Sequence, residues 1–252
     1  MKPIIDKTQI FAHRGASGHV PQSTLEAFEL AHKMGAEGIE LDVRFSADGE
    51  VIVTHEVKLE KLTEATGNIA DLTLAELKEL DFGYKFYNGE KKGFKIPTLD
   101  EVFELVKPLG MTVNVEIKLP SHELVEKTVD IVKRHGMEEK VIYSSFNHYN
   151  LKWVKEAHPD AFIAPLHHWN LLNAWNYCID IGAFATHPEL IILKEDKEYV
   201  KNCHDKGIRV HSWTANTPEN IQFLLDCGVD VIMTDYPDIG VQLRDKMYSQ
   251  NG

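Results

Sequence analysis

The chain has 252 residues, of which 43% are hydrophobic and 26% are charged, a composition typical of a folded globular protein. Its net charge of -12 disfavours nonspecific binding to nucleic acid or to anionic membrane. No run of about 18 apolar residues could span a bilayer, and the start lacks the apolar stretch of a secretory signal. We therefore expect no nucleic-acid partner, no stable membrane association and a cytoplasmic location.

Short runs rich in β-branched residues alternate along the chain with amphipathic stretches of about 10 to 15 residues, which predicts parallel strands joined by helices. The predicted strands are residues 9–13, 38–45, 112–118, 141–146, 161–167, 183–187, 208–214 and 229–235. Repeated units of this kind predict an α/β fold, the (β/α)8 or TIM barrel, in one domain over residues 1–252. A doubly wound sheet is the main structural alternative.

The segment after the second predicted strand breaks this rhythm. Residues 51–56, VIVTHE, follow the strand 38–45 after a turn that is too short for a helical crossover, so they predict a hairpin. Residues 57–97 then precede the next amphipathic helix and include a predicted short helix at 72–80. We expect a small insertion over about residues 46–97 that caps the barrel.

Polar residues interrupt the second strand, GIELDVRF. Glu40 and Asp42 alternate with aliphatic residues, so both carboxylates point to one face of the strand, which in a barrel is the lumen. Two buried carboxylates this close repel each other unless a cation neutralises them, and one divalent ion, Mg²⁺ or Ca²⁺, with Mn²⁺ as a further option, suits them. Arg44, on the same face, offers the alternative of a structural salt bridge.

Other predicted strands end in polar residues that would reach the same end of the barrel. Glu116 and Lys118 add a third carboxylate and a cation from the strand 112–118. A two-residue turn at Asp48-Gly49 would pair Ala47 with Glu50 and place His55 opposite Asp42.

The first strand, which adjoins the second in a barrel, ends in His13 and Arg14. Trp213 ends the strand 208–214 and would be either a core aromatic residue or an apolar wall for a ligand. Two histidines, three carboxylates, an arginine and a lysine suit an anionic phosphodiester, because the cations offset charge in the transition state and imidazoles exchange protons near neutral pH.

In their order along the chain, these residues resemble the glycerophosphodiester phosphodiesterase family. The matching motifs are His13-Arg14-Gly15, Glu40-x-Asp42, His55, Glu116-x-Lys118, IPTLDEVFELV, SSF, SWTANT and GVDVIMTDYP. The resemblance covers nearly the whole chain. It implies a (β/α)8 barrel with an insertion after the second strand, and metal-dependent hydrolysis of glycerophosphodiesters, such as glycerophosphocholine and glycerophosphoethanolamine, to sn-glycerol 3-phosphate and an alcohol.

The resemblance also implies a role for each site residue. His13 and His55 would form the acid-base pair, Glu40, Asp42 and Glu116 would bind Mg²⁺ or Ca²⁺, Arg14 and Lys118 would hold the phosphate, and Trp213 would line the glycerol side.

The chain departs from the family's usual pattern at Gln22, Glu56 and Lys61, where the family commonly has glutamate, aspartate and arginine. These departures bear on substrate or metal preference more than on the reaction. Two other readings stay open. One is a phospholipase-like relative of sphingomyelinase D or of phosphoinositide phospholipases, and the other is a noncatalytic protein that binds glycerophosphodiesters.

Overall fold

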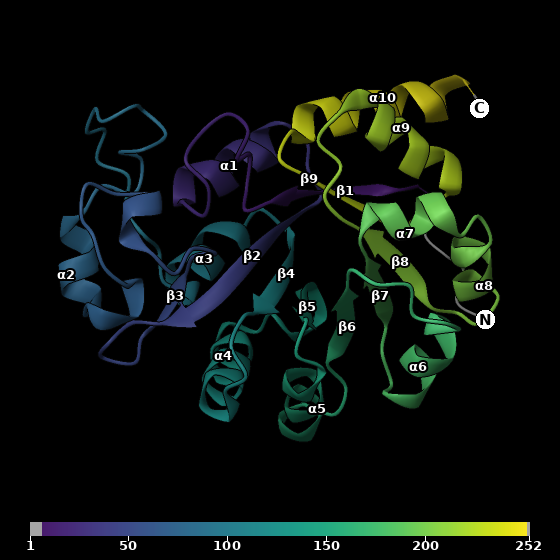
Figure 1. Cartoon of the computed structure of the whole chain (residues 1–252), viewed down its shortest axis with the longest axis horizontal. Coiled ribbons are helices and arrows are strands. Elements are labelled where there is room, and N and C mark those ends of the chain that lie inside the picture. Colours follow the sequence, from purple (N-terminus) through teal and green to yellow (C-terminus); the bar gives the residue numbers. More distant parts are fainter. Residues whose placement is uncertain (1–6, 251–252) are drawn as a thin grey trace.

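Eight parallel strands close into a barrel in the computed structural model, which describes residues 7–250 (Figure 1). Going around the barrel the order is β1, β2, β4, β5, β6, β7, β8 and β9, and β9 pairs with β1 to close it. The strands are β1 (Gln9–His13), β2 (Gly38–Phe45), β4 (Thr112–Ile117), β5 (Val141–Ser145), β6 (Phe162–His167), β7 (Ala185–Pro188), β8 (Arg209–Ser212) and β9 (Val231–Thr234). The predicted barrel is confirmed, with strand ends within two residues of those expected from the sequence.

Helices connect the strands and cover the outside of the barrel (Figure 1). They are α1 (Leu25–Lys33), α3 (Leu99–Val106), α4 (His122–His135), α5 (His148–Ala157), α6 (Ala174–Asp180), α7 (Leu190–Glu195), α8 (Tyr199–His204), α9 (Pro218–Cys227) and α10 (Pro237–Gln250), with a 3-10 turn at Glu138–Lys140. Their apolar faces and the outward-facing strand residues share one large buried cluster. The core of the fold therefore lies between the barrel and its helices.

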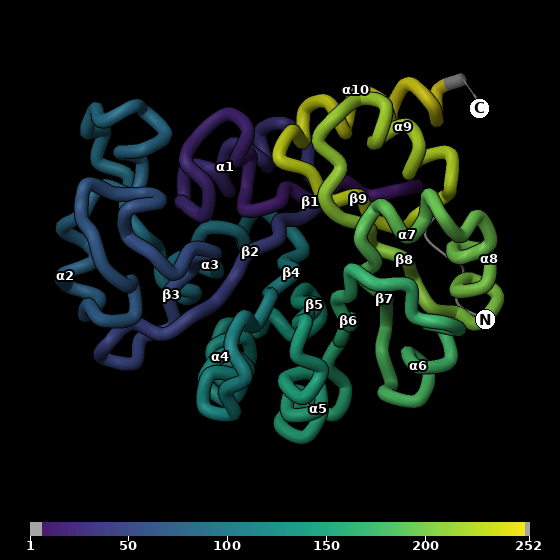
Figure 2. Tube along the Cα trace, in the orientation of Figure 1, coloured from purple at the N-terminus to yellow at the C-terminus, as the bar shows by residue number. Residues whose placement is uncertain are grey.

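The segment between β2 and α3 stands to one side of the barrel as a separate lobe, drawn in blue (Figure 2). It holds β3 (Val51–Val53), antiparallel to β2, two 3-10 turns at Leu59–Lys61 and Ile69–Asp71, and α2 (Leu74–Glu79). The lobe has a small apolar core of its own, formed by Ile52, Leu59, Leu62, Ile69, Leu77, Phe82 and Ile96. The predicted insertion after the second barrel strand, with its hairpin and short helix, is thus present.

A buried carboxylate fixes the loop at the end of this lobe. Asp81 accepts hydrogen bonds from the backbone N–H groups of Gly83 (2.8 Å), Lys92 (2.5 Å), Gly93 (2.7 Å) and Phe94 (3.2 Å). Burial opposes ionisation of Asp81, but these N–H groups outweigh it and hold the pKa of Asp81 below its ordinary value. Asp81 therefore ties the two ends of the loop over residues 82–94 together.

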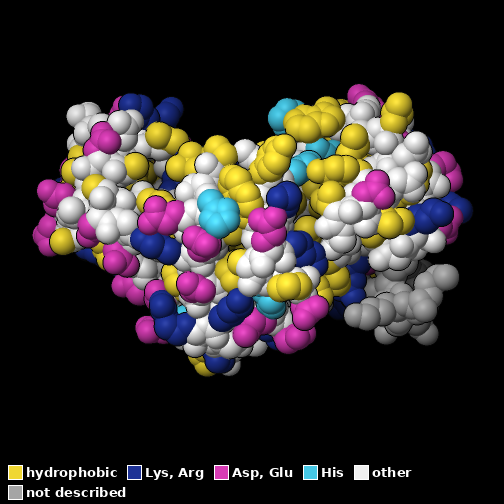
Figure 3. Space-filling model, turned by 90° about the horizontal axis from the view of Figure 1, so that it is seen from below, with side chains coloured by type: hydrophobic (Ala, Val, Ile, Leu, Met, Phe, Trp, Pro, Cys, Tyr) yellow, Lys and Arg dark blue, Asp and Glu magenta, His cyan; other side chains and the backbone are white. Residues whose placement is uncertain are grey.

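Figure 3 shows the face that carries α4 and α5, where basic and acidic side chains are interspersed, and the molecule is hollowed at the upper edge of this view beside the lobe. Throughout residues 7–250, each helix is too short or too polar to cross a lipid bilayer.

Candidate active site

Three neighbouring strands, β1, β2 and β4, bring the predicted polar residues together at their carboxyl ends. His13 of β1 is in register with Glu40 of β2, and Asp42 of β2 is in register with Glu116 of β4. Each of these side chains points into the lumen because the residues between them are the aliphatic ones that face the helices.

Glu40, Asp42 and Glu116 form a buried acidic cluster. Each offers a carboxylate oxygen that lies within 4.8 Å of the other two, and their exposed fractions are only 3%, 0% and 8%. Both oxygens of Asp42 lack a hydrogen-bond donor among the described residues. Buried carboxylate oxygens without donors are a costly arrangement that a hard divalent cation would satisfy, so this donor set fits a metal ion.

Burial and the closeness of the three negative charges shift the pKa values of the cluster's carboxyl groups. Burial, and next the charge of Asp42, raise the pKa of Glu40 well above its ordinary value and the pKa of Glu116 to about 7. Burial opposes ionisation of Asp42 as well, yet Lys118 and Arg14 outweigh it and keep the pKa of Asp42 below its ordinary value. Both glutamates of the metal-free cluster are therefore harder to ionise than ordinary glutamates, and a bound cation would favour their ionised forms.

Two cations flank the cluster as predicted. Arg14 Nε lies 3.5 Å from an Asp42 oxygen, and Lys118 Nζ lies 3.4 Å from Asp42 and 2.6 Å from Glu116. The expected alternative, a salt bridge from Arg44, is not formed in residues 7–250. The Arg44 guanidinium instead donates to the backbone oxygen of His55 (3.0 and 3.2 Å) and so anchors the segment that carries this histidine.

The predicted hairpin register is wrong by one residue. β3 pairs with β2 through Val43–Val53 and Phe45–Val51, so Thr54 and not His55 lies opposite Asp42, and the Thr54 N–H donates to the backbone oxygen of Asp42 (2.9 Å). The turn is longer than two residues because Ser46, not Ala47, closes it against Glu50. His55 lies past the end of the strand and still reaches the acidic cluster.

The two histidines have matching surroundings. His13 Nδ1 lies 2.6 Å from Asp235, and His55 Nδ1 lies 3.2 Å from Glu56, so each ring has a carboxylate at Nδ1 and keeps Nε2 for the site. His13 Nε2 lies 3.9 Å from Glu40. Burial lowers the pKa of His55, against the opposing charge of Asp42, so His55 is neutral at pH 7.

A cavity of about 110 Å³ joins these groups, and all of the predicted site residues except the deeply buried Asp42 line it. Its other walls include Phe146 and Trp213, which meet edge to face with ring centroids 5.5 Å apart. The Trp213 Nε1–H donates to the backbone oxygen of His187 (2.9 Å), which fixes the ring at the rim. Trp213 is therefore a wall of the cavity, and it also packs against a small buried apolar cluster that includes Phe11 and Met233.

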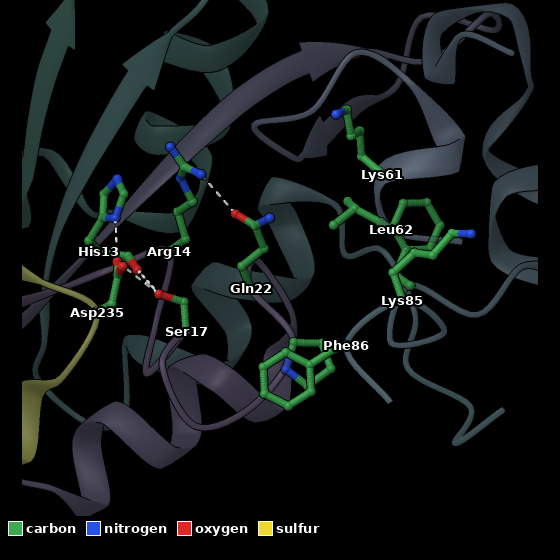
Figure 4. Close-up of a pocket in the computed structure, with 11 residues that line it drawn as sticks. His13, Arg14, Ser17, Gln22, Lys61, Leu62, Lys85, Phe86 and Asp235 are labelled. Atoms are coloured by element: carbon green, nitrogen blue, oxygen red, sulfur yellow. Dashed lines mark hydrogen bonds and ion pairs between the residues drawn. The ribbon is translucent and has the colours of Figure 1, made fainter. Parts of the chain in front are cut away.

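A larger cavity, of about 440 Å³, opens between the barrel and the lobe (Figure 4). His13 and Arg14 line both cavities, and Gln22 of the loop after β1 accepts a hydrogen bond from Arg14 Nη1 (2.9 Å). The side chains from the lobe are Lys61, Leu62, Phe82, Lys85 and Phe86.

Backbone conformation and packing explain why residue 15 is glycine. It adopts φ +82°, which favours glycine, and an added Cβ would lie 2.6 Å from Ala27 Cβ in α1. The turn that presents His13 and Arg14 therefore requires glycine for its packing against α1.

Sequence reasoning missed the partners of His13. Asp235 follows β9 and also accepts hydrogen bonds from Ser17 Oγ (3.0 Å) and Asn216 Nδ2 (2.5 Å). Asn216 Oδ1 in turn accepts the Asp235 N–H (2.9 Å). Asp235 could have been found as the polar residue that ends the last predicted strand, since that strand also adjoins the first in a closed barrel.

Comparison with known proteins identifies the reaction to which this arrangement of histidines, carboxylates and cations belongs. The profile of the glycerophosphoryl diester phosphodiesterase family matches residues 13–239. The chain belongs to this family. It is 40% identical over 243 residues to a glycerophosphodiester phosphodiesterase of Caldanaerobacter subterraneus, with 94% of this chain and 98% of that protein covered. It is 35% identical to one of Bacillus altitudinis, with 95% and 99% covered.

Solved structures of similar proteins support this family assignment. A phosphodiesterase of Oleispira antarctica, in complex with the product sn-glycerol-3-phosphate, superposes with a TM-score of 0.87 at 28% identity, with 95% of this chain and 97% of that chain covered. A glycerophosphodiester phosphodiesterase of Thermotoga maritima superposes with a TM-score of 0.77 at 30% identity, with 95% and 100% covered. The chain is a glycerophosphodiester phosphodiesterase, a phosphoric diester hydrolase.

Proposed function

We propose that this site hydrolyses glycerophosphodiesters, such as glycerophosphoethanolamine, to sn-glycerol 3-phosphate and an alcohol, with His13 and His55 as the acid-base pair. The observation that carries the proposal is that two histidines, each with a carboxylate at Nδ1, line one cavity with a buried acidic cluster and two cations. The Oleispira antarctica relative holds sn-glycerol-3-phosphate, which supports the same product here.

Glu40, Asp42 and Glu116 are the proposed ligands of one divalent cation. Oxygen donors alone favour Mg²⁺ or Ca²⁺, and Mn²⁺ would also be accepted. Such an ion supplies electrostatic stabilisation of the negative charge that grows on the phosphoryl oxygens. Arg14 and Lys118, which lie against Asp42, hold the phosphate beside the cluster and share this stabilisation.

The two histidines take different roles because they face different cavities. His55 lines only the small cavity and is neutral at pH 7, so it takes the proton from the attacking water as the new P–O bond forms. His13 also lines the large cavity, where the alcohol leaves, and its Nδ1 lies 2.6 Å from an Asp235 oxygen. His13 therefore protonates the alcohol oxygen as the P–O bond to it breaks. Trp213 and Phe146 form the apolar wall for the glycerol carbons.

Substitution of either histidine tests these roles. His13→Ala and His55→Ala should each reduce release of sn-glycerol 3-phosphate by at least about 10²-fold, the usual contribution of a positioned acid or base. His168→Ala is the matched control, since this exposed histidine lies at the barrel rim beside Phe146 and lines neither cavity. Full activity of either His13→Ala or His55→Ala would contradict the assignment. Substrate binding without turnover by the wild-type protein would favour the binding-protein reading.

A further inference from the structure

The larger cavity is the place for the alcohol part of the substrate. It meets the small cavity at His13 and Arg14, the proposed proton donor and one of the phosphate ligands. A diester whose glycerol lies against Trp213 therefore extends its other substituent between the loop after β1 and the lobe (Figure 4).

The charged side chains around this cavity are mostly basic. Arg14, Lys61 and Lys85 line it, and its one acidic residue is Asp235, whose oxygens are already bonded to His13, Ser17 and Asn216. Gln22 contributes a neutral amide that accepts a hydrogen bond from Arg14 and adds no negative charge to the cavity. Figure 4 shows Lys61 across the cavity from Arg14 and Gln22.

The two lysines of the lobe that line the cavity, Lys61 and Lys85, also lack carboxylate partners among the described residues. Within residues 7–250, no carboxylate oxygen lies within 4.0 Å of the Lys61 or Lys85 ammonium, whereas Lys91 and Lys92 nearby form ion pairs with Glu64 and Glu90. Both lysines are exposed and so keep their charge at little cost. Phe82 and Phe86 add apolar surface to the cavity lining, and Phe86 is 43% exposed.

We propose that this cavity selects substrates whose alcohol carries an anionic group, a carboxylate or a phosphate, over those with a cationic alcohol such as choline. Lys61 and Lys85 attract the anion and repel a quaternary ammonium group. The ring face of Phe86 alone does not offset two like charges. The inference rests on the proposed phosphodiesterase activity and concerns the leaving alcohol only.

Glycerophosphoserine and glycerophosphoethanolamine make the sharpest pair of substrates, because they differ by one carboxylate on the alcohol. With wild-type protein and Mg²⁺, kcat/KM should favour glycerophosphoserine, by about two- to fivefold for each lysine, the range of exposed ion pairs. Lys61→Gln and Lys85→Gln should each reduce this ratio, mainly through KM. Lys61→Arg should keep it.

Lys58→Gln is the matched control, since Lys58 is an exposed lysine of the same lobe that does not line the cavity. Gln22→Glu should also lower the ratio, because it places a carboxylate between Arg14 and Lys61. Turnover of both substrates with equal kcat/KM, unchanged in the two glutamine variants, would overturn this inference and leave the phosphodiesterase intact. No turnover of either substrate, with Mg²⁺, Ca²⁺ or Mn²⁺, would overturn both.

Discussion

Asp235→Asn should remove most of the activity without changing the shape of the site. In the wild-type protein the Asp235 carboxylate accepts a hydrogen bond from His13 Nδ1–H (2.6 Å). This leaves Nε2 as the atom that exchanges protons with the substrate. Asparagine has the same size, but an NH₂ group, which donates, replaces one of the two carboxylate oxygens.

The surrounding hydrogen bonds decide which position that is. Asn216 Oδ1 accepts the backbone N–H of residue 235, so Asn216 Nδ2 faces the Asp235 Oδ2 position and needs an oxygen there. The new amide nitrogen must then face His13 Nδ1, which stabilises the wrong tautomer of the imidazole. Loss of one charge-assisted hydrogen bond costs about 1.5–3 kcal/mol, and the wrong tautomer adds to it. We expect kcat to fall by about 10²- to 10⁴-fold.

The assay is release of sn-glycerol 3-phosphate from glycerophosphoethanolamine, followed with thermal unfolding of each variant as a check on folding. Asp238→Asn is the control, because Asp238 contacts His19 at 2.9 Å in a similar pair that is exposed and lines neither cavity. A kcat for Asp235→Asn within twofold of the wild-type value would refute the orienting role of Asp235.

Two further predictions concern the metal and the lobe. Because burial, and then Asp42, raise the pKa of Glu116 to about 7, Mg²⁺ must displace a proton from most Glu116 carboxyl groups at pH 6 but from few at pH 8. The rise in Tm caused by Mg²⁺ should therefore be larger at pH 8, and equal rises at both pH values would contradict a protonated cluster. Asp81→Ala should lower the free energy of unfolding in urea by about 2–4 kcal/mol, since it leaves the buried N–H of Gly83 and three part-buried N–H groups without their acceptor. Asp71→Ala, at an exposed position of the lobe, should change it little, and equal losses in the two variants would refute the role of Asp81.

The barrel and most of the site could be predicted because each depends on local patterns. Alternation of Glu40 and Asp42 with aliphatic residues fixes the lumen face, and the closure of a barrel then brings β1 and β4 to the same place. The acidic cluster follows from these two facts. No detail of the intervening loops is needed to place it.

The hairpin register and the partners of His13 depend on geometry that sequence patterns do not carry. Ser46 closes a longer turn through its side chain and backbone, which shifts β3 by one residue against β2. Asp235 lies 222 residues from His13 in the chain, so only the closed barrel shows that they meet. The two cavities likewise exist only once the lobe is folded against the loop after β1.

The most direct test of the account is ³¹P NMR of glycerophosphoethanolamine with the wild-type protein, before and after treatment with EDTA and again after Mg²⁺ or Ca²⁺ is returned. We expect the sn-glycerol 3-phosphate signal to grow with metal present, to stop in EDTA and to resume on addition of the metal. Undiminished hydrolysis in excess EDTA, or a phosphorus-containing product other than sn-glycerol 3-phosphate, would contradict the proposed role of the Glu40, Asp42 and Glu116 cluster in this reaction.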